Sequence, residues 1–275
     1  MTSDSPSSAS PVESRLRAAI IGAGMIAEVH RRSILLSGAE LVGVLGSRPE
    51  RSAEVGAAWG VRGYDDLDAL LADSVDVVHI CTPNATHAFY AEAALRAGIH
   101  VVCEKPLGVD VAEARRLADL AAETGLVATV PFVYRYHPLV REIRARREAG
   151  EFGEWNLLHG TYLQDWLLAP GSSSWRVDPA AGGASRAFAD IGSHWCDLVE
   201  WVSGERFASL TARLSIAMAD RPAPSGHAFS GGGDADAARV PVTTEDSAVV
   251  MLETESGVIG NVVISQLSAG RKNRL

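Results

Sequence analysis

The sequence predicts an α/β protein, in which an N-terminal domain with a doubly wound parallel sheet precedes an α+β domain built on an open, mostly antiparallel sheet. Three observations support this fold class. Short apolar runs alternate with helical patterns from Leu16 to about Val133. The first apolar run leads into a glycine-rich turn, Gly22–Ala27. After Tyr134 the pattern changes to longer strands separated by polar and glycine-rich segments.

The strands of the first domain are expected to be parallel, because their apolar residues are near-continuous, as in strands covered on both faces. Pro49 suits the first turn of a helix, and Gly98 and Gly125 suit helix ends. The expected strands are Arg17–Ile21, Leu41–Leu45, Val75–Cys81, Ile99–Cys103 and Leu126–Phe132, and the expected helices are Met25–Leu36, Pro49–Trp59, Tyr90–Ala97 and Val111–Glu123.

The second domain is expected to hold fewer helices and longer strands. We assign residues 1–14 to a disordered tail, 15–134 to the first domain and 135–275 to the second. The expected helices are His137–Ala149 and Asp190–Val202, the strands are Trp155–Gln164, Phe207–Met218, Ser247–Thr254 and Val258–Leu267, and the loops are Asp165–Ala189 and Pro222–Arg239, with a hairpin turn at Gly257.

Composition excludes several classes of partner. The 275 residues carry a formal net charge of -9, which disfavours nucleic acids and anionic membranes. No apolar run reaches the ~18 residues of a membrane-spanning helix, and the Ser/Pro-rich start lacks the apolar core of a signal peptide. Cys81, Cys103 and Cys196 show no metal-type spacing, and an odd number of cysteines fits a reducing compartment. We therefore expect a cytoplasmic protein without a metal site.

The turn after the first strand carries the pattern G-x-G-x-x-A, with Gly22, Gly24 and Ala27. The first glycine allows the tight turn, the second lets a pyrophosphate approach the backbone, and the third position packs helix against strand. The phosphate would meet free N–H groups at Met25 and Ile26, where the helix begins. Gly/Ala-rich turns also occur without a ligand, but the strand–turn–helix context favours a Rossmann dinucleotide site.

The end of the second strand indicates which cofactor binds. Many NAD-binding domains have an acidic residue there for the ribose 2′-hydroxyl, whereas this chain has Gly46-Ser47-Arg48 and no acid from Leu41 to Pro49. Ser47 can hydrogen-bond a 2′-phosphate, and Arg48 can pair with it or stack on the adenine. Arg48 is alternatively a solvated residue at a helix entrance. The sequence predicts NADP or NAD as cofactor and favours NADP.

Lys105, Asp190 and His194 form the candidate catalytic set. Lys105 ends a strand of the parallel sheet, at the edge where ligands bind. Asp190 and His194 are four residues apart, so on a helix they share a face, and the carboxylate is expected to raise the basicity of the imidazole. Lysine would hydrogen-bond a substrate hydroxyl, and histidine would accept its proton. The alternative is that Asp190 caps the helix and His194 is a buried histidine without a chemical role.

Five segments together resemble the Gfo/Idh/MocA family of oxidoreductases over nearly the whole chain. They are G-A-G-M-I-A, T-P-N-A-T-H, A-G-I-H-V-V-C-E-K-P-L, Y-R-Y-H-P, and G-G followed by A-D-I-G-S-H. The resemblance implies a Rossmann domain, a substrate domain whose open sheet is often used for oligomerisation, and catalytic positions at Lys105, Asp190 and His194. It also implies cofactor contacts from Thr82, Pro83, Asn84, His87, Glu104, Lys105, Arg135 and Trp175. With the proline at a strand end, it suggests a cis Lys105-Pro106 bond.

The expected function is a cytoplasmic NAD(P)-dependent oxidoreductase that acts on a sugar, inositol or related polyol. The same motifs leave one alternative open. That alternative is a non-catalytic dinucleotide-binding regulator or an inactive truncated homologue. The chain is shorter than typical members of the family. We therefore expect a truncated form, with an unpaired apolar edge after Val258–Leu267 that favours association through the second sheet.

Overall fold

The computed structural model describes residues 15–223 and 238–275. The expected tail, residues 1–14, and residues 224–237 of the expected loop lie outside the described part. The chain divides into two compact units, and the division falls between His79 and Ile80 in the sequence.

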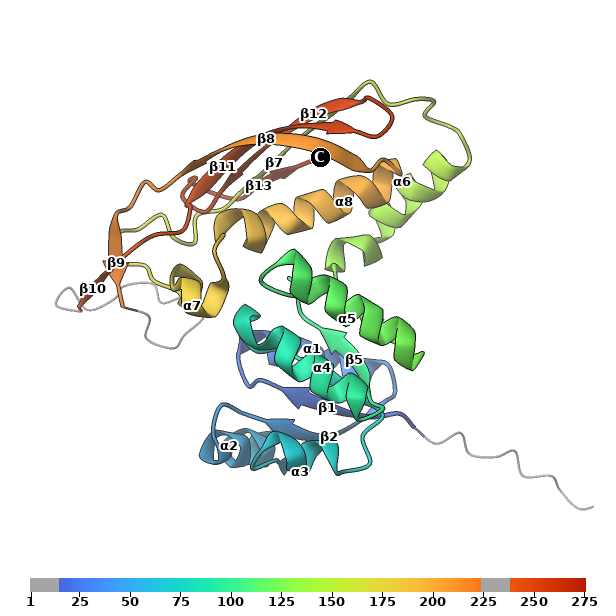
Figure 1. Cartoon of the computed structure of the whole chain (residues 1–275), viewed down its shortest axis with the longest axis vertical. Coiled ribbons are helices and arrows are strands. Elements are labelled where there is room, and N and C mark those ends of the chain that lie inside the picture. Colours follow the sequence, from blue (N-terminus) through green and yellow to red (C-terminus); the bar gives the residue numbers. More distant parts are fainter. Residues whose placement is uncertain (1–14, 224–237) are drawn as a thin grey trace, which may run out of the picture. The chain divides into compact units, whose positions relative to one another are not determined.

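Figure 1 labels most of the helices and strands along the chain. The helices are α1 (Met25–Leu36), α2 (Pro49–Trp59), α3 (Leu67–Leu71), α4 (His87–Arg96), α5 (Val111–Thr124), α6 (Pro138–Glu148), α7 (Pro179–Gly182) and α8 (Ser193–Ser203). The strands are β1 (Arg17–Ile21), β2 (Glu40–Leu45), β3 (Arg62–Gly63), β4 (Val77–Ile80), β5 (His100–Cys103), β6 (Ala128–Thr129), β7 (Leu157–Leu163), β8 (Phe207–Ser215), β9 (Asp220–Pro222), β10 (Arg239–Pro241), β11 (Ser247–Thr254), β12 (Ile259–Ser265) and β13 (Lys272–Arg274). Shorter turns are the 3-10 helices η1 (Asn84–Thr86), η2 (Val133–Tyr136) and η3 (Trp175–Val177) and the π-helical turn η4 (Phe188–Gly192).

The first sheet has six strands in the order β3-β2-β1-β4-β5-β6. This is the strand order of a Rossmann fold, with the order reversing beside β1. The pairs β1–β2, β2–β3 and β5–β6 are parallel. Ala18, Ala19 and Ile20 of β1 are fully buried, as expected for a central strand covered on both faces. The predicted α/β class is therefore confirmed for this half of the fold.

The second sheet has five strands in the order β13-β7-β12-β11-β8. Its pairs are antiparallel except β7–β12, which is parallel, so the expected open and mostly antiparallel sheet is confirmed. The expected unpaired edge after Val258–Leu267 is wrong. Strand β12 pairs with β7 on one side and β11 on the other, and the short strand β13 pairs with β7 beyond it. The edges of this sheet are β13 and β8.

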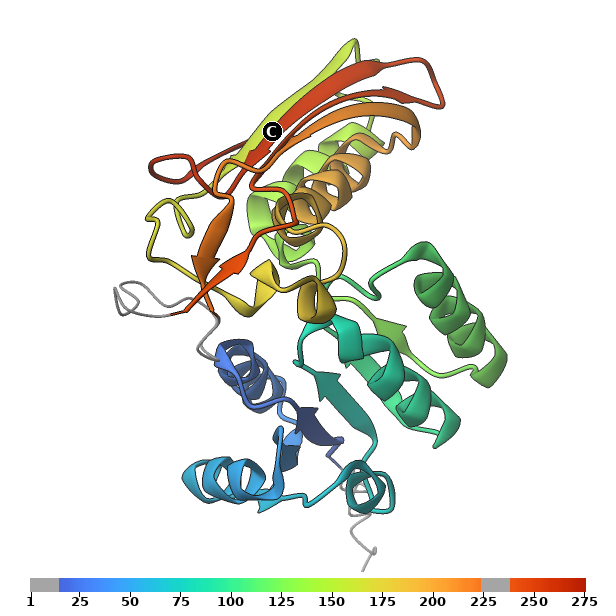
Figure 2. The ribbon, with the colours of Figure 1, turned by 60° about the vertical axis from the view of Figure 1, so that its left-hand side comes forward.

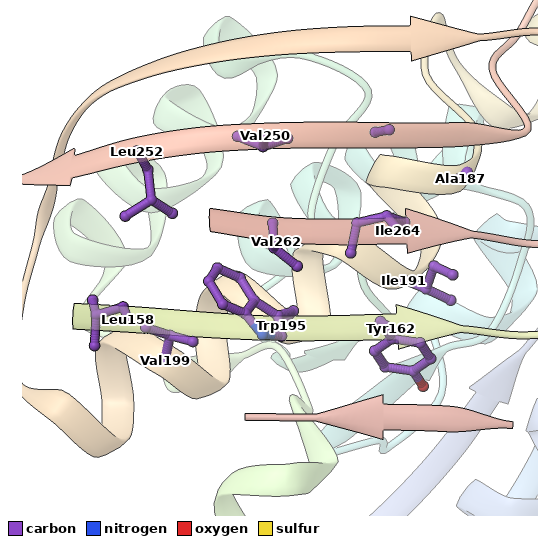
Figure 3. Close-up of a cluster of buried hydrophobic side chains, with 11 residues drawn as sticks. Leu158, Tyr162, Ala187, Ile191, Trp195, Val199, Val250, Leu252, Val262 and Ile264 are labelled. Carbon is purple, nitrogen blue, oxygen red and sulfur yellow. The ribbon is translucent and has the colours of Figure 1, made fainter. Parts of the chain in front are cut away.

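Helix α8 lies against one face of the second sheet, and α6 lies beside α8 (Figures 1 and 2). Figure 3 shows Trp195 and Val199 of α8 among side chains of the sheet. Trp195 is 2% exposed, and Val262 and Ile264 of β12 are similarly buried. Full burial of an aliphatic side chain of this size contributes about 1.5–3 kcal/mol. This core holds the segment that precedes α8 against the sheet.

The opposite face of the second sheet exposes apolar side chains. In β11 the residues alternate between buried and exposed, which is the pattern of a sheet covered on one face. Val249, Met251, Leu157 and Ile259 are each at least half exposed. Among the described residues, no helix is both long and apolar enough to cross a lipid bilayer.

A buried ionic cluster joins three segments of the second unit. Asp246, Arg186 and Arg221 are almost completely buried. One carboxylate oxygen of Asp246 pairs with both guanidinium groups, and the other accepts the backbone N–H groups of Ala217 and Met218. Burial raises the pKa of Asp246, but Arg186 and these N–H groups outweigh it, so the pKa lies below its ordinary value. The cluster therefore keeps its negative charge.

Candidate active site

The glycine-rich turn between β1 and α1 has the geometry that phosphate binding requires. Gly22 has φ of 101°, a conformation that favours glycine, and its N–H donates to the carbonyl of Leu45 at 2.7 Å. Gly24 precedes α1, and a Cβ added there would meet no atom within 4 Å. The N-cap residue Gly24 offers no side-chain cap to the first N–H groups of the helix, where Met25 and Ile26 lie. These residues fit a dinucleotide pyrophosphate, because open space and unpaired donors occur at the same helix end.

The end of β2 is polar and exposed. Ser47 and Arg48 are both exposed, and Arg48 Nε lies 3.7 Å from the carboxylate of Glu50. The side chain of Arg48 is 68% exposed, so this surface pair holds it only weakly. Gly46 donates its N–H to the hydroxyl of Ser52 at 2.8 Å, which ties the strand end to α2.

The segment after β4 is anchored by two buried side chains. Asn84 Nδ2 donates to the carbonyl of Gly182 at 3.0 Å. His87 lies between two backbone carbonyls, with Nδ1 2.7 Å from Pro106 O and Nε2 2.9 Å from Thr82 O. Thr82 and Pro83 precede η1, so these contacts fix the turn that begins at the end of β4.

The turn after β5 directs Lys105 toward Asp190. The Lys105-Pro106 peptide is cis, as predicted. Lys105 Nζ donates to the carboxylate Oδ1 and to the backbone carbonyl of Asp190, both at 3.0 Å. The side chains of Lys105 and Asp190 are 14% and 8% exposed. An ammonium has three N–H donors, and the two bonds to Asp190 occupy two of those of Lys105 within the described part of the chain. Glu104 Oε2 accepts the backbone N–H of Lys105 at 3.1 Å.

Three side chains of the described residues bind the carboxylate of Asp190. Arg176 Nε lies 3.2 Å from the same oxygen that Lys105 contacts, and Gln266 Nε2 donates to Oδ2 at 2.9 Å. Burial raises the pKa of Asp190, but the charges of Lys105 and Arg176 outweigh it and hold the pKa below its ordinary value. Asp190 is therefore a permanent carboxylate near neutral pH.

The sequence predicted that Asp190 and His194 lie on one regular helix, and this prediction is wrong. Asp190 lies in the π-helical turn η4, and His194 is in the first turn of α8. The predicted loop Asp165–Ala189 also contains η3 and α7. The π turn inserts an extra residue into the helical repeat, so the side chains are not placed by the simple four-residue spacing.

His194 lies among aromatic rings. Its ring centroid is 5.3 Å from that of Tyr134 and 6.2 Å from that of Tyr162, and Phe132 packs edge-on at 5.9 Å. The hydroxyls of Tyr134 and Tyr162 are 2.6 Å apart. The buried Nδ1 of His194 has no hydrogen-bond partner among the described residues. Together with both tyrosines, His194 lines a cavity of about 110 Å³.

The expected rise in the basicity of His194 is wrong. Burial, with the ammonium of Lys105, lowers the pKa of His194 to about 4, although the carboxylate of Asp190 opposes this shift. Desolvation of the imidazolium dominates because the aromatic neighbours offer it no acceptor. The imidazole is neutral near pH 7 and retains one nitrogen able to accept a proton.

Arg135 and Trp175 have partners within the second unit. Arg135 binds the carboxylate of Asp197 through two nitrogens, and its guanidinium lies 4.5 Å from the ring of Trp201. Trp175 is partly buried and stacks with Arg176 at 4.5 Å. Their expected cofactor contacts stay predictions.

Sequence reasoning gave no role to Gln266, although it contacts the candidate catalytic carboxylate. Its only local signal is a polar residue at the end of the apolar run before Leu267. The described residues contain no group of three or more His, Cys, Asp or Glu side chains that could hold a metal ion.

Two family models match the chain. Residues 16–132 match the oxidoreductase family with an NAD-binding Rossmann fold, and residues 140–275 match the GFO/IDH/MocA C-terminal domain. The chain belongs to the Gfo/Idh/MocA family. The family resemblance of the sequence is thereby confirmed, and the first domain is of the NAD-binding type.

Similar proteins include dehydrogenases of sugars. Levoglucosan dehydrogenase from Pseudarthrobacter phenanthrenivorans is 34% identical over 82% of this chain and 59% of its own length. The crystal structure of an oxidoreductase domain protein from Kribbella flavida has a TM-score of 0.85 and 33% identity, and covers 94% of this chain and 70% of that chain. A levoglucosan dehydrogenase in complex with NADH and L-sorbose has a TM-score of 0.86 and 29% identity, over 94% of this chain and 69% of that chain. The chain thus spans about three fifths of the curated relative's length.

Proposed function

We propose that the protein is an NAD(P)-dependent dehydrogenase that oxidises a CH–OH group of a sugar, inositol or related polyol. The observation that carries the proposal is the buried pair of Lys105 and Asp190, which lies at the end of a Rossmann strand and, among the described residues, occupies two of the three ammonium donors. The similarity to levoglucosan dehydrogenase supports a sugar or polyol as the substrate.

The residues divide the chemistry between them. Asp190 holds the Lys105 ammonium, whose remaining N–H donates to the substrate oxygen and orients the hydroxyl group. Neutral His194 accepts the hydroxyl proton as the C–O bond becomes a carbonyl. A bound nicotinamide supplies the acceptor for the hydride. The glycine-rich turn with Gly22 and Gly24, and the segment from Thr82 to His87, are assigned to cofactor binding.

We further propose that NADP(H) binds at least as well as NAD(H). No acidic side chain ends β2, and Ser47 and Arg48 are exposed there. One well-formed charge-assisted pair contributes about 1.5–3 kcal/mol, which corresponds to a roughly ten- to hundredfold preference. Titration of the protein with both cofactors tests this directly, and much tighter binding of NAD(H) would overturn it.

The exposed apolar face of the second sheet supports a homo-oligomer, and a cytoplasmic location is retained as part of the proposal. Val249, Met251 and Ile259 project from neighbouring strands on that face. Sedimentation measurements on the wild type and on Met251→Lys would test the oligomer. A monomeric wild type would contradict it.

The dehydrogenase is tested with a panel of sugars and polyols that includes levoglucosan, L-sorbose and inositol, scored by the absorbance of the reduced nicotinamide. Lys105→Met should lower turnover by roughly 10²–10⁴-fold, because it removes the group that orients the reacting oxygen. Cofactor affinity should change little. Lys272→Met, at an exposed position of β13, is the matched control.

Two results would contradict the assignment. Lys105→Met with a near-normal kcat would remove Lys105 from the chemistry. Cofactor binding without turnover of any compound in the panel would instead favour the non-catalytic regulator.

A further inference from the structure

Gln266 is the only neutral side chain that hydrogen-bonds the carboxylate of Asp190 within the described residues, and it is fully buried. Its Nε2 lies 2.9 Å from Oδ2, on the side of the carboxylate away from the oxygen that Lys105 and Arg176 share. A carboxylate only accepts hydrogen bonds, so the amide must present its NH₂ group to Asp190.

The backbone holds Gln266 in this place. Its N–H donates to the carbonyl of Asp246 at 3.0 Å, and its carbonyl accepts the N–H of Leu167 at 3.1 Å. The Oε1 atom of the side chain is buried without a hydrogen-bond partner among the described residues. A buried acceptor without a hydrogen bond lowers the stability of the folded protein, so this orientation of the amide carries a cost in free energy. The contact with Asp190 offsets that cost.

We propose that Gln266 is a positioning residue for the dehydrogenase reaction, holding the Asp190 carboxylate so that Oδ1 faces Lys105 and Arg176. The inference rests on the proposed function for its catalytic consequence. With Oδ2 held by the amide, rotation of the carboxylate would break a hydrogen bond, so the Lys105 ammonium keeps one orientation. The substrate oxygen then meets a donor whose direction is already set.

The charged and titratable groups that face Asp190 are Lys105, Arg176, His194 and Tyr162. The two cations favour the carboxylate, and burial disfavours it. The Gln266 amide donates a stronger hydrogen bond to the charged carboxylate than to the neutral acid, so its removal should shift the protonation of Asp190 to higher pH.

The direct test follows the ionisation of Asp190 without turnover. Full-length protein is labelled with ¹³C at the aspartate carboxyl carbons, and the Asp190 resonance is identified by its absence in Asp190→Asn. In Gln266→Met that resonance should titrate about one pH unit higher than in the wild type. Gln164→Met is the matched control, because Gln164 is equally buried but donates to Asn273 at 2.8 Å. Its Asp190 resonance should titrate as in the wild type.

A second variant covers the case in which Gln266→Met fails to fold. Gln266→Glu keeps the size of the side chain and places a second carboxyl beside Asp190, so one proton should be taken up by the pair at higher pH. An unchanged Asp190 titration in either folded variant would overturn the proposal.

Kinetics supply the catalytic readout for any compound that the wild type turns over. Gln266→Met should lower kcat roughly tenfold with little change in the cofactor KM. A lower kcat with an unmoved Asp190 titration would assign Gln266 to packing alone. Absence of wild-type turnover would count against the proposed function, while the carboxyl titration would still decide the contact.

Discussion

Replacement of His194 by asparagine should make the stability of the protein less dependent on pH. Burial lowers the pKa of His194 from an ordinary 6.5 to about 4. At about 1.4 kcal/mol per pH unit, this displacement corresponds to about 3 kcal/mol when both states are fully protonated. At pH 5, where the folded imidazole is still neutral, the unfolded chain already gains about 2 kcal/mol from protonation.

The sign follows from proton binding. Between pH 6.5 and about 4 the unfolded chain binds more protons at His194 than the folded protein does, so the free energy of unfolding rises with pH. The stability that the protein gains from keeping His194 neutral is fully present above pH 6.5, and it is lost as the pH falls toward about 4. In His194→Asn, unfolding free energy should therefore drop by about 2 kcal/mol less between pH 7 and pH 5 than in the wild type.

Urea denaturation at a series of pH values measures the difference. His79→Asn is the matched control, because burial and the neighbouring His30 lower the pKa of His79 to about 4 as well. Both variants should flatten the pH dependence of stability, but only His194→Asn should reduce turnover. Parallel curves for the wild type and His194→Asn would refute the low pKa of the folded imidazole.

Two further predictions concern packing and cofactor choice. A Cβ at Gly160 would lie 2.0 Å from Trp195 Nε1 and 2.6 Å from the carbonyl of Arg274. Gly160→Ala should therefore lower the free energy of unfolding, measured in urea, by about 1–3 kcal/mol. A Gly160→Ala variant as stable as the wild type would show that the indole can move aside. Arg48→Ala should weaken the binding of NADP(H) roughly tenfold in fluorescence titrations and leave the affinity for NAD(H) unchanged. Arg32→Ala, an exposed control on α1, should change neither affinity.

Local patterns predicted the elements whose signals are strong. The bounds of β1, α1, α2 and β11 agree with the sequence prediction, because each combines a clear apolar period with a proline, glycine or polar boundary. The expected strand Leu126–Phe132 shortens to Ala128–Thr129, which lies at the edge of the sheet and is exposed. The short elements α3, β3 and β13 were not predicted, because two to five residues carry too little periodicity.

The site was predictable where strand ends determine it. Lys105 lies two residues after the end of β5 in the Rossmann sheet, and its ammonium pairs with Asp190. The partners Arg176 and Gln266 come from segments whose approach to Asp190 depends on how the second sheet forms. The low pKa of His194 depends on the rings of Tyr134 and Tyr162, which no local pattern reveals.

The parallel pairing of β7 with β12 has a consequence for folding. His159 of β7 bonds Asn261 of β12, which follows it by 102 positions. Closing a loop of this length is an entropic cost that local contacts cannot offset, and such non-local pairings slow folding. Gln266 follows β12 directly, so Asp190 acquires this partner only when that loop has closed. We expect the Asp190 carboxylate to be among the last groups to reach its native surroundings during refolding.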